Sequence, residues 1–152
     1  MKVQPRRVLA AVLLAGCLVL AGCAAAGEPT TPDAEPVEVK AISGTELNRV
    51  VVSAEASRNI GIETQPVRAA PLSPGAAAPW TTVPITAVIY DPAGASWVYT
   101  NPALRTFVRA SVAIERTDAT SAILTSGPPV GTAVVTVGAS ELIGAEYGVG
   151  GE

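Results

Sequence analysis

The 152-residue chain contains no histidine, so it lacks both the most common general base of enzymes and the most common metal ligand. It has two cysteines, and its single methionine is the initiator, which leaves few ligands for soft metals. No glycine-rich loop ends in Gly-Lys-Ser/Thr, and Ser140 in "GASEL" has neither the second glycine of a nucleophile elbow nor a base. We therefore expect a protein that is not an enzyme and needs no cofactor or metal.

Residues 1–22 have the composition of a secretory signal peptide. An apolar run over residues 8–22 is too short and too rich in small side chains for a clear membrane span. It follows a basic start formed by Lys2, Arg6 and Arg7. The run ends in "LAGC", which resembles the lipobox of bacterial lipoproteins and implies cleavage before Cys23 and acylation of that residue. The alternatives are an ordinary signal peptide, a twin-arginine signal or a single anchoring helix.

Cleavage before Cys23 would change both the thiol content and the charge. It would remove Cys17 and three of the ten basic residues, leaving seven against thirteen acidic residues. With Cys23 acylated, no free thiol remains, and two acyl chains give stable membrane attachment. The acidic balance and the lack of a basic cluster argue against nucleic acid as a partner. We expect a protein anchored by lipid to the extracytoplasmic face of the cell membrane.

The first structured segment follows a linker that is rich in proline, threonine and acidic residues. "RVVVS" (residues 49–53) predicts a strand because it is rich in β-branched residues. Ser53 and Gly61 are typical start and stop signals for a short helix between them. "GIETQPV" (residues 61–67) predicts a second strand, and Pro66 indicates that it lies at a sheet edge.

The rest of the chain alternates between strand and turn patterns. The segment over residues 82–90 predicts one strand, the turn "DPAGAS" follows, and "WVYT" returns. Residues 107–116 alternate as a strand whose outward positions include Arg109 and Glu115. Strands are predicted for "SAILTS" and "AVVTV", followed by a short closing helix that Ser140 opens. These patterns predict a mainly β fold with short helices, built as a β-barrel or a sandwich. The expected organisation is a signal peptide (1–22), a lipid-anchored flexible linker (23–36), a strand–helix–strand segment (37–68), a linker (69–81), a β-domain (82–147) and a tail (148–152).

Trp97 and Tyr99 lie two positions apart in a predicted strand, so their side chains share a face. They form either a platform for a ligand or part of the core, and packing is the more common role of aromatic residues. Asp91, Glu115 and Asp118 are spread through turns and a strand face, which is typical of solvated acids.

The stretch "VPITAVIYDPAGASWVYT" resembles the membrane-proximal region of periplasmic adaptor subunits, also called membrane fusion proteins, of resistance-nodulation-division and heavy-metal efflux transporters. The segment "SGPPVGTAVVTVGA" is similar to a glycine-rich element in the closing strands of that family. Upstream, "VVVSAEASRNIGIETQPV" is similar to the segment that precedes the family's lipoyl region. The resemblance covers residues 49–68 and 82–147.

The resemblance implies a small antiparallel β-barrel or β-roll like an adaptor membrane-proximal domain. It also implies a non-catalytic, adaptor-like subunit that docks on an efflux permease of the RND or ABC type. Arg109 and Glu115 are then candidate contacts with that permease, and homo-oligomers are possible because adaptors of the family form rings. Family members place a lipoyl domain and a long α-helical hairpin between the two matching segments, whereas this chain has only residues 69–81 there. The alternatives are a free-standing envelope lipoprotein that binds a small ligand or cell-wall component through Trp97 and Tyr99, and an adaptor remnant without a transport role.

Overall fold

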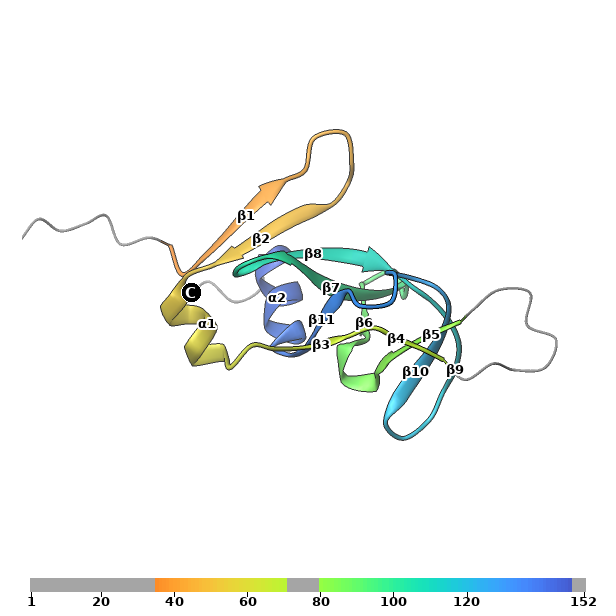
Figure 1. Ribbon diagram of the computed structural model, residues 1–152. Helices are drawn as coiled ribbons and strands as arrows, with labels where there is room; N and C mark the ends of the chain where they lie inside the picture. Colours follow the sequence, from red (N-terminus) through yellow and green to blue (C-terminus); the bar gives the residue numbers. More distant parts are fainter. Residues whose placement is uncertain (1–34, 71–79, 149–152) are drawn as a thin grey trace, which may run out of the picture. The chain divides into compact units, whose positions relative to one another are not determined.

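The computed structural model describes residues 35–70 and 80–148, which belong to one compact unit starting at Asp33 (Figure 1). The predicted signal peptide, Cys23, most of both predicted linkers and residues 149–152 lie outside the described residues. Segments 37–68 and 82–147, which the sequence analysis separated, are parts of the same unit.

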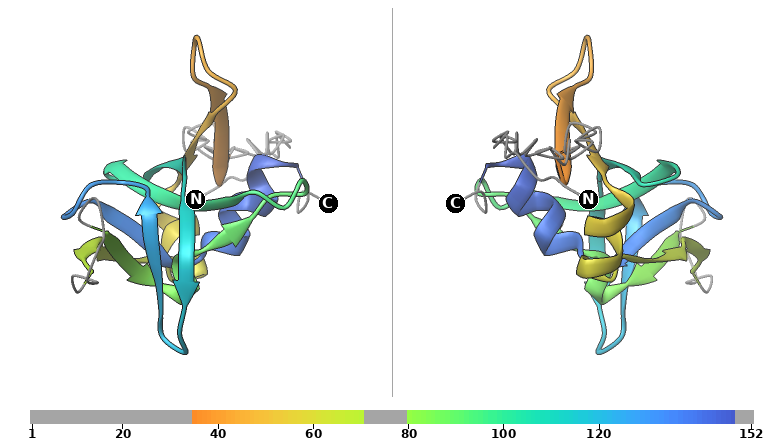
Figure 2. Two further views of the ribbon diagram at one scale, coloured as in Figure 1. Left: turned by 90° about the vertical axis from the view of Figure 1, so that its right-hand side faces the viewer. Right: turned by 90° about the vertical axis from the view of Figure 1, so that its left-hand side faces the viewer.

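The described residues form two antiparallel sheets and two α-helices, so the prediction of a mainly β fold is confirmed, although neither sheet closes into a barrel. The larger sheet has the order β1-β2-β8-β7-β11-β3, with β6 also paired to β7. Its strands are β1 (Val37–Ala41), β2 (Asn48–Val52), β3 (Glu63–Pro66), β6 (Ile89–Tyr90), β7 (Ser96–Ala103), β8 (Thr106–Ser111) and β11 (Ala133–Val137). The smaller sheet has the order β4-β5-β10-β9, with β4 (Arg68–Ala69), β5 (Thr81–Pro84), β9 (Ala113–Thr117) and β10 (Ser121–Ser126). Figure 2 shows the β1–β2 and β9–β10 hairpins in two further views.

The chain passes between the sheets at four points, and each has a buried residue, which is Pro128 in the β10–β11 connection. Val67 separates β3 from β4, a 3₁₀ turn at Ile85–Ala87 separates β5 from β6, and Val112 separates β8 from β9. Val67, Ala87 and Val112 belong to one hydrophobic cluster with Val98 and Val134. This cluster therefore fills the region where the two sheets meet.

A second cluster lies on the other face of the larger sheet and includes the helix α2 (Ala139–Glu146). Tyr99, Phe107 and Val135 come from the sheet, and Ala139 and Leu142 come from α2. Neighbouring residues such as Val98 and Tyr99 enter different clusters because successive side chains of a strand point to opposite faces. The central strands β7 and β11 are thus buried on both faces.

Local sequence signals explain the helix α1 (Ala54–Ile60) and the edge strand β3. The Ser53 hydroxyl accepts a hydrogen bond of 3.1 Å from the Ala56 N–H, and Gly61 ends the helix in the left-handed region at φ 71°. Both features confirm the sequence prediction. β3, which contains Pro66, lies at the edge of its sheet, also as predicted.

Three predicted elements are wrong in their bounds. The single strand expected over residues 82–90 is two strands, because the 3₁₀ turn after Pro84 moves the chain from one sheet to the other. The strand expected over residues 107–116 is divided at Val112 for the same reason. The closing helix is capped by Gly138, at φ 90°, rather than opened by Ser140. No sequence pattern predicts β1, whose residues are mostly exposed.

Candidate functional site

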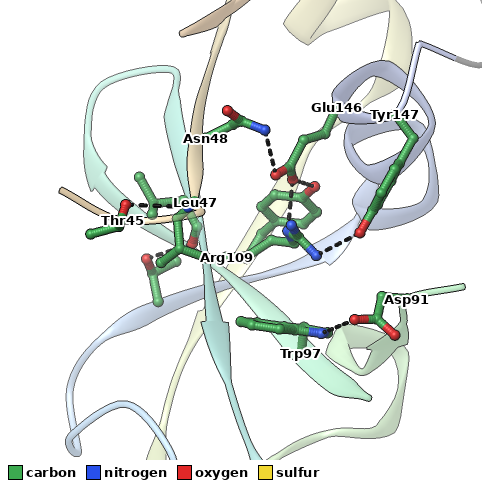
Figure 3. Close-up of polar contacts among 11 residues, drawn as sticks. Thr45, Leu47, Asn48, Asp91, Trp97, Arg109, Glu146 and Tyr147 are labelled. Atoms are coloured by element: carbon green, nitrogen blue, oxygen red, sulfur yellow. Dashed lines mark hydrogen bonds and ion pairs between the residues drawn. The ribbon is translucent and has the colours of Figure 1, made fainter. Parts of the chain in front are cut away.

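Arg109 is the most unusual residue of the described part, because its charged side chain lies on a covered face of β8 and the residue is only 7% exposed. Its Nε lies 2.9 Å from Oε2 of Glu146, whose side chain is 1% exposed at the end of α2. The Nε–H is not directed at this oxygen and has no other acceptor within the described residues, so the contact at Nε is an ion pair without a hydrogen bond. Figure 3 shows the pair between β8 and α2.

Other side chains complete the coordination of Glu146. The Tyr99 hydroxyl donates a hydrogen bond of 2.5 Å to Oε2, and the Asn48 amide donates one of 3.3 Å to Oε1. Asn48 begins β2, Tyr99 lies in β7 and Arg109 in β8, so three strands contact one carboxylate. This arrangement fixes the end of α2 against the larger sheet.

Two aromatic rings enclose the guanidinium group of Arg109. Its Cζ lies 4.8 Å from the centroid of the Trp97 ring and 5.3 Å from that of Tyr147. The Tyr147 hydroxyl also accepts a hydrogen bond of 3.1 Å from Nη1. Cation–π contacts of this kind stabilise a partly desolvated cation. We call the residues that surround the ion pair the Arg109 cluster: Asn48, Trp97, Tyr99, Arg109, Glu146 and Tyr147.

The surroundings of Arg109 favour the charged form of its side chain. Burial by itself would lower the pKa of Arg109, but Glu146 and Tyr147 outweigh it, and the pKa is raised. Burial raises the pKa of the Tyr99 phenol far above its usual range, and the hydrogen bond to Glu146 adds to this effect. Tyr99 therefore remains a hydrogen-bond donor rather than a proton-transfer group near neutral pH.

Asp91 supports the cluster from the β6–β7 turn. Its Oδ2 accepts a hydrogen bond of 3.0 Å from the Trp97 indole, and its Oδ1 accepts bonds of 2.9 Å from the N–H groups of Ala93 and Ala95. The hydrogen bond from Ala95 is the main cause that lowers the pKa of Asp91. The turn thereby sets the position of the indole that stacks on Arg109.

The structure separates the site residues predicted from sequence into two groups. Arg109 is not an exposed partner contact, and that prediction is wrong because α2 covers the face of β8 that was expected to meet solvent. Glu115 is exposed on β9, as expected. Tyr99 is 0% exposed and Trp97 packs against the same cluster, so these two residues belong to the core and not to an open ligand platform. Cys23 lies outside the described residues.

No sequence pattern predicts Asn48, Glu146 and Tyr147 as partners of Arg109, because they lie far from it in the chain. One local signal was available: Arg109 is two positions from Phe107 in a strand, and the two side chains share a face. Because Phe107 is buried, the alternation of β8 places Arg109 on a covered face. No local pattern identifies Glu146 as its partner.

An open groove of about 410 Å³ lies between the β3–β4 segment and the turn that joins β9 to β10. Its lining includes one cation, Arg68, and the hydroxyls of Thr82 and Ser121. Thr82 donates its hydroxyl proton to the Ala122 carbonyl at 3.2 Å, and Ser121 donates to Asp118 at 2.8 Å. These hydroxyl groups are thus committed to the fold, and the groove offers no acid–base pair.

Asp118 organises the β9–β10 turn, and this leads to a pH prediction. Its carboxylate accepts hydrogen bonds from the N–H groups of Thr120 and Ser121, both at 2.8 Å, and from both hydroxyls. These bonds, led by that from the Thr120 N–H, lower the pKa of Asp118 from 3.8 to about 2. Because the folded-state pKa is the lower one, the stabilisation is complete above pH 3.8 and is lost as the pH falls toward 2.

We therefore expect the urea midpoint to fall between pH 4 and pH 2, and to fall less in Asp118→Asn than in the parent chain. Urea unfolding followed by tryptophan fluorescence at several pH values measures this difference. Glu115→Gln, which removes an exposed acid close to the turn, is the matched control and should keep the parent's pH dependence. Identical pH profiles for the parent and Asp118→Asn would contradict the prediction.

Within residues 35–70 and 80–148, no group of three or more acidic, cysteine or histidine side chains is placed to hold a metal ion. In the same part of the chain, no helix is long and apolar enough to cross a membrane. Comparisons with family models, with curated proteins and with solved structures found no match to the chain.

Proposed function

We propose that the chain is a non-catalytic, lipid-anchored accessory subunit of a membrane efflux transporter, and that its β-unit docks on the extracytoplasmic face of the permease. The proposal combines the resemblance to periplasmic adaptor subunits with one observation from the fold. The two segments that carry the resemblance, 49–68 and 82–147, are interleaved in both sheets.

The pairings between these segments are extensive. β2 pairs with β8 and β3 pairs with β11 in the larger sheet, and β4 pairs with β5 in the smaller one. In the resembled family, the same two segments are separated by the lipoyl domain and the helical hairpin. Direct pairing between the two segments supports the proposal, because it joins them into one β-unit without the inserted domains.

The connection between the two segments closes without an inserted domain. Ala69 lies opposite Thr81 in the β4–β5 pair, and the Ala70 N–H donates a hydrogen bond of 2.9 Å to the Trp80 carbonyl. The chain therefore enters and leaves residues 71–79 at neighbouring points. This geometry supports a role in docking on one membrane protein, since the hairpin that would reach toward a second membrane has no counterpart between these strands.

The polar residues of the unit favour binding over catalysis. The Arg109 cluster satisfies its charges internally, and the Tyr99 hydroxyl is committed to Glu146. Of the two permease contacts expected from sequence, Arg109 is withdrawn, and Glu115 on the edge strand β9 remains the proposed contact. The alternative ligand-binding function loses its proposed surface, because Tyr99 is buried and Arg109 covers the Trp97 ring.

A pull-down from native membranes tests the proposal. With an affinity tag after Glu152 and mild detergent, we expect an efflux permease to co-purify with the parent chain and not with Cys23→Ala, which cannot be acylated. Glu115→Ala should reduce the recovery of the permease, whereas Glu141→Ala, a change at an exposed acid of α2, should not. Recovery of the lipoprotein alone after cross-linking would overturn the proposal and favour a free-standing envelope lipoprotein.

A further inference from the structure

The turn over residues 101–106, which joins β7 to β8, presents a leucine to solvent. Leu104 is 81% exposed and is the most exposed large apolar residue of the described part. Exposed apolar side chains are common when they are scattered, so this exposure needs a second feature before it indicates a contact. Two such features are present: side-chain hydrogen bonds fix the shape of the turn, and the turn lies where the N-terminal linker enters the sheet.

Side-chain hydrogen bonds hold the turn in one shape. The Asn101 amide donates to the carbonyls of Ala103 and Thr106, at 2.7 and 2.9 Å, and the Thr106 hydroxyl donates to the Leu104 carbonyl at 3.2 Å. Arg105 has φ 54° and is the only residue other than glycine with a positive φ in residues 35–70 and 80–148. Glycine or asparagine adopts this conformation more easily, so the turn carries an arginine at a strained position.

Hydrogen bonds place this turn beside the point where the N-terminal linker enters the sheet. The Val52 N–H donates to the Arg105 carbonyl at 3.0 Å, and Val52 lies opposite Val37, the first residue of β1. The adjacent Ser53 N–H donates to the Pro36 carbonyl at 2.9 Å. The 14 residues from Cys23 to Pro36 are joined by 13 peptide bonds, so they span at most about 45 Å when fully extended. An acyl anchor on Cys23 would thus keep this end of the sheet within about 45 Å of the bilayer.

We propose that the 101–106 turn contacts the lipid bilayer surface, with Leu104 entering the interface and Arg105 meeting lipid phosphate groups. This inference rests on the proposed function only through the acylation of Cys23. An apolar side chain beside a cation is suited to the interface of an anionic membrane. Within the described residues Arg105 forms no ion pair. Glu38 is the acid near it in the sheet, because Glu38 lies opposite Val51 and Val51 lies opposite Thr106. Glu38 is paired with Lys40 instead, at 2.5 Å.

A contact of one leucine and one arginine is weak by itself, and the anchor makes it effective. Once the chain is attached to the membrane, the turn meets the same surface at a high effective concentration. The expected result is a preferred orientation of the β-unit on the bilayer rather than binding of an unanchored protein. The opposite end of β7 should then point away from the membrane.

Fluorescence quenching tests this orientation. The mature product, cleaved before Cys23 and acylated there as verified by mass spectrometry, has no free thiol, so Leu104→Cys gives a single site for an environment-sensitive dye. The protein is reconstituted into vesicles of phosphatidylcholine and phosphatidylglycerol that contain a spin-labelled quencher lipid. The control is Tyr90→Cys, an exposed position (59%) opposite Ser96 at the other end of β7, on the order of 25 Å away along the strand.

We expect quenching at position 104 to exceed that at position 90 by severalfold and to decrease in vesicles without phosphatidylglycerol. Arg105→Gly in the Leu104→Cys background should reduce it as well, and because glycine relieves the positive φ, this loss does not come from unfolding. Equal quenching at the two positions would overturn the proposal, as would quenching at 104 that occurs only after a permease is added, since the turn then contacts protein.

The outcomes separate this inference from the proposed function. Absence of acylation on Cys23 refutes the anchor itself, before any fluorescence is measured. Recovery of a permease in the pull-down without quenching at position 104 refutes only the bilayer contact. Quenching at position 104 without recovery of a permease supports the bilayer contact and refutes the adaptor-like role.

Discussion

Replacing Arg109 with alanine is expected to lower the free energy of unfolding by about 3–5 kcal/mol, because the change leaves the carboxylate of Glu146 buried without a cation. The side chain of Glu146 is 1% exposed, so water cannot replace the guanidinium group. The substitution also removes the cation that stacks on Trp97 and Tyr147. Domains of this size have a total stability of roughly 5–15 kcal/mol, so much of it depends on this one side chain.

Urea or guanidinium unfolding, followed by tryptophan fluorescence, measures the effect of Arg109→Ala. Arg116→Ala, at an exposed arginine on β9, is the matched control and should change stability by less than about 0.5 kcal/mol. The double variant Arg109→Met/Glu146→Gln should be much more stable than the sum of its single variants implies, because it removes both charges together. A loss below about 1 kcal/mol for Arg109→Ala would show that the ion pair is not a main stabilising contact.

Gly138→Ala is expected to destabilise the fold by about 2–4 kcal/mol, through two separate effects. Gly138 has φ 90°, a conformation that side chains with a Cβ rarely adopt. An added Cβ would lie 2.8 Å from Cγ2 of Ile60 and 3.0 Å from Cγ1 of Ile62, and both residues pack against the second hydrophobic cluster, which includes α2. Since Gly138 joins β11 to α2, the change would also displace the helix that carries Glu146.

Gly94→Ala separates the two effects, because Gly94 has a similar φ of 85° but no atom within 4 Å of an added Cβ. It should lower stability by only about 1–2 kcal/mol, which is the backbone contribution alone. The additional loss in Gly138→Ala then reports the steric contact, and Ile60→Ala should recover part of it in a double variant. Equal losses at the two glycines would mean that the contact with Ile60 and Ile62 is relieved without energetic consequence.

Elements with local signals could be predicted from the sequence. Ser53 and Gly61 define α1 because capping depends on residues within one helical turn. The β6–β7 hairpin follows from the turn chemistry of residues 91–96, and the edge position of β3 follows from Pro66. The assignment of Trp97 and Tyr99 to one buried face follows from the period of a strand.

What the sequence analysis missed depends on contacts between distant residues. The strand breaks after Pro84 and at Val112 occur because the chain changes sheets there, and each run of residues is compatible with one continuous strand. Alternation assigns the residues of a strand to two faces, but it does not indicate whether one face or both are covered. Arg109 was therefore expected in solvent, although its face of β8 is buried. Its pairing with Glu146, 37 positions later, requires the position of α2.

The interleaving of the two segments also determines the order in which the molecule can fold. Val50 lies opposite Phe107, 57 positions later, and Thr64 lies opposite Val135, 71 positions later. Pairings between such distant residues form slowly, because the entropy of closing the intervening loop is lost before the contacts are gained. β2 can pair early with β1, but its buried residues Val50 and Val52 meet Phe107 and Tyr99 only when β7 and β8 are available. β3 has no partner strand until nearly the whole chain is present. A cut before β11 would leave β3 without its partner strand and would remove Val135, Ala139 and Leu142 from the second hydrophobic cluster, so the unit needs both β11 and α2 to fold.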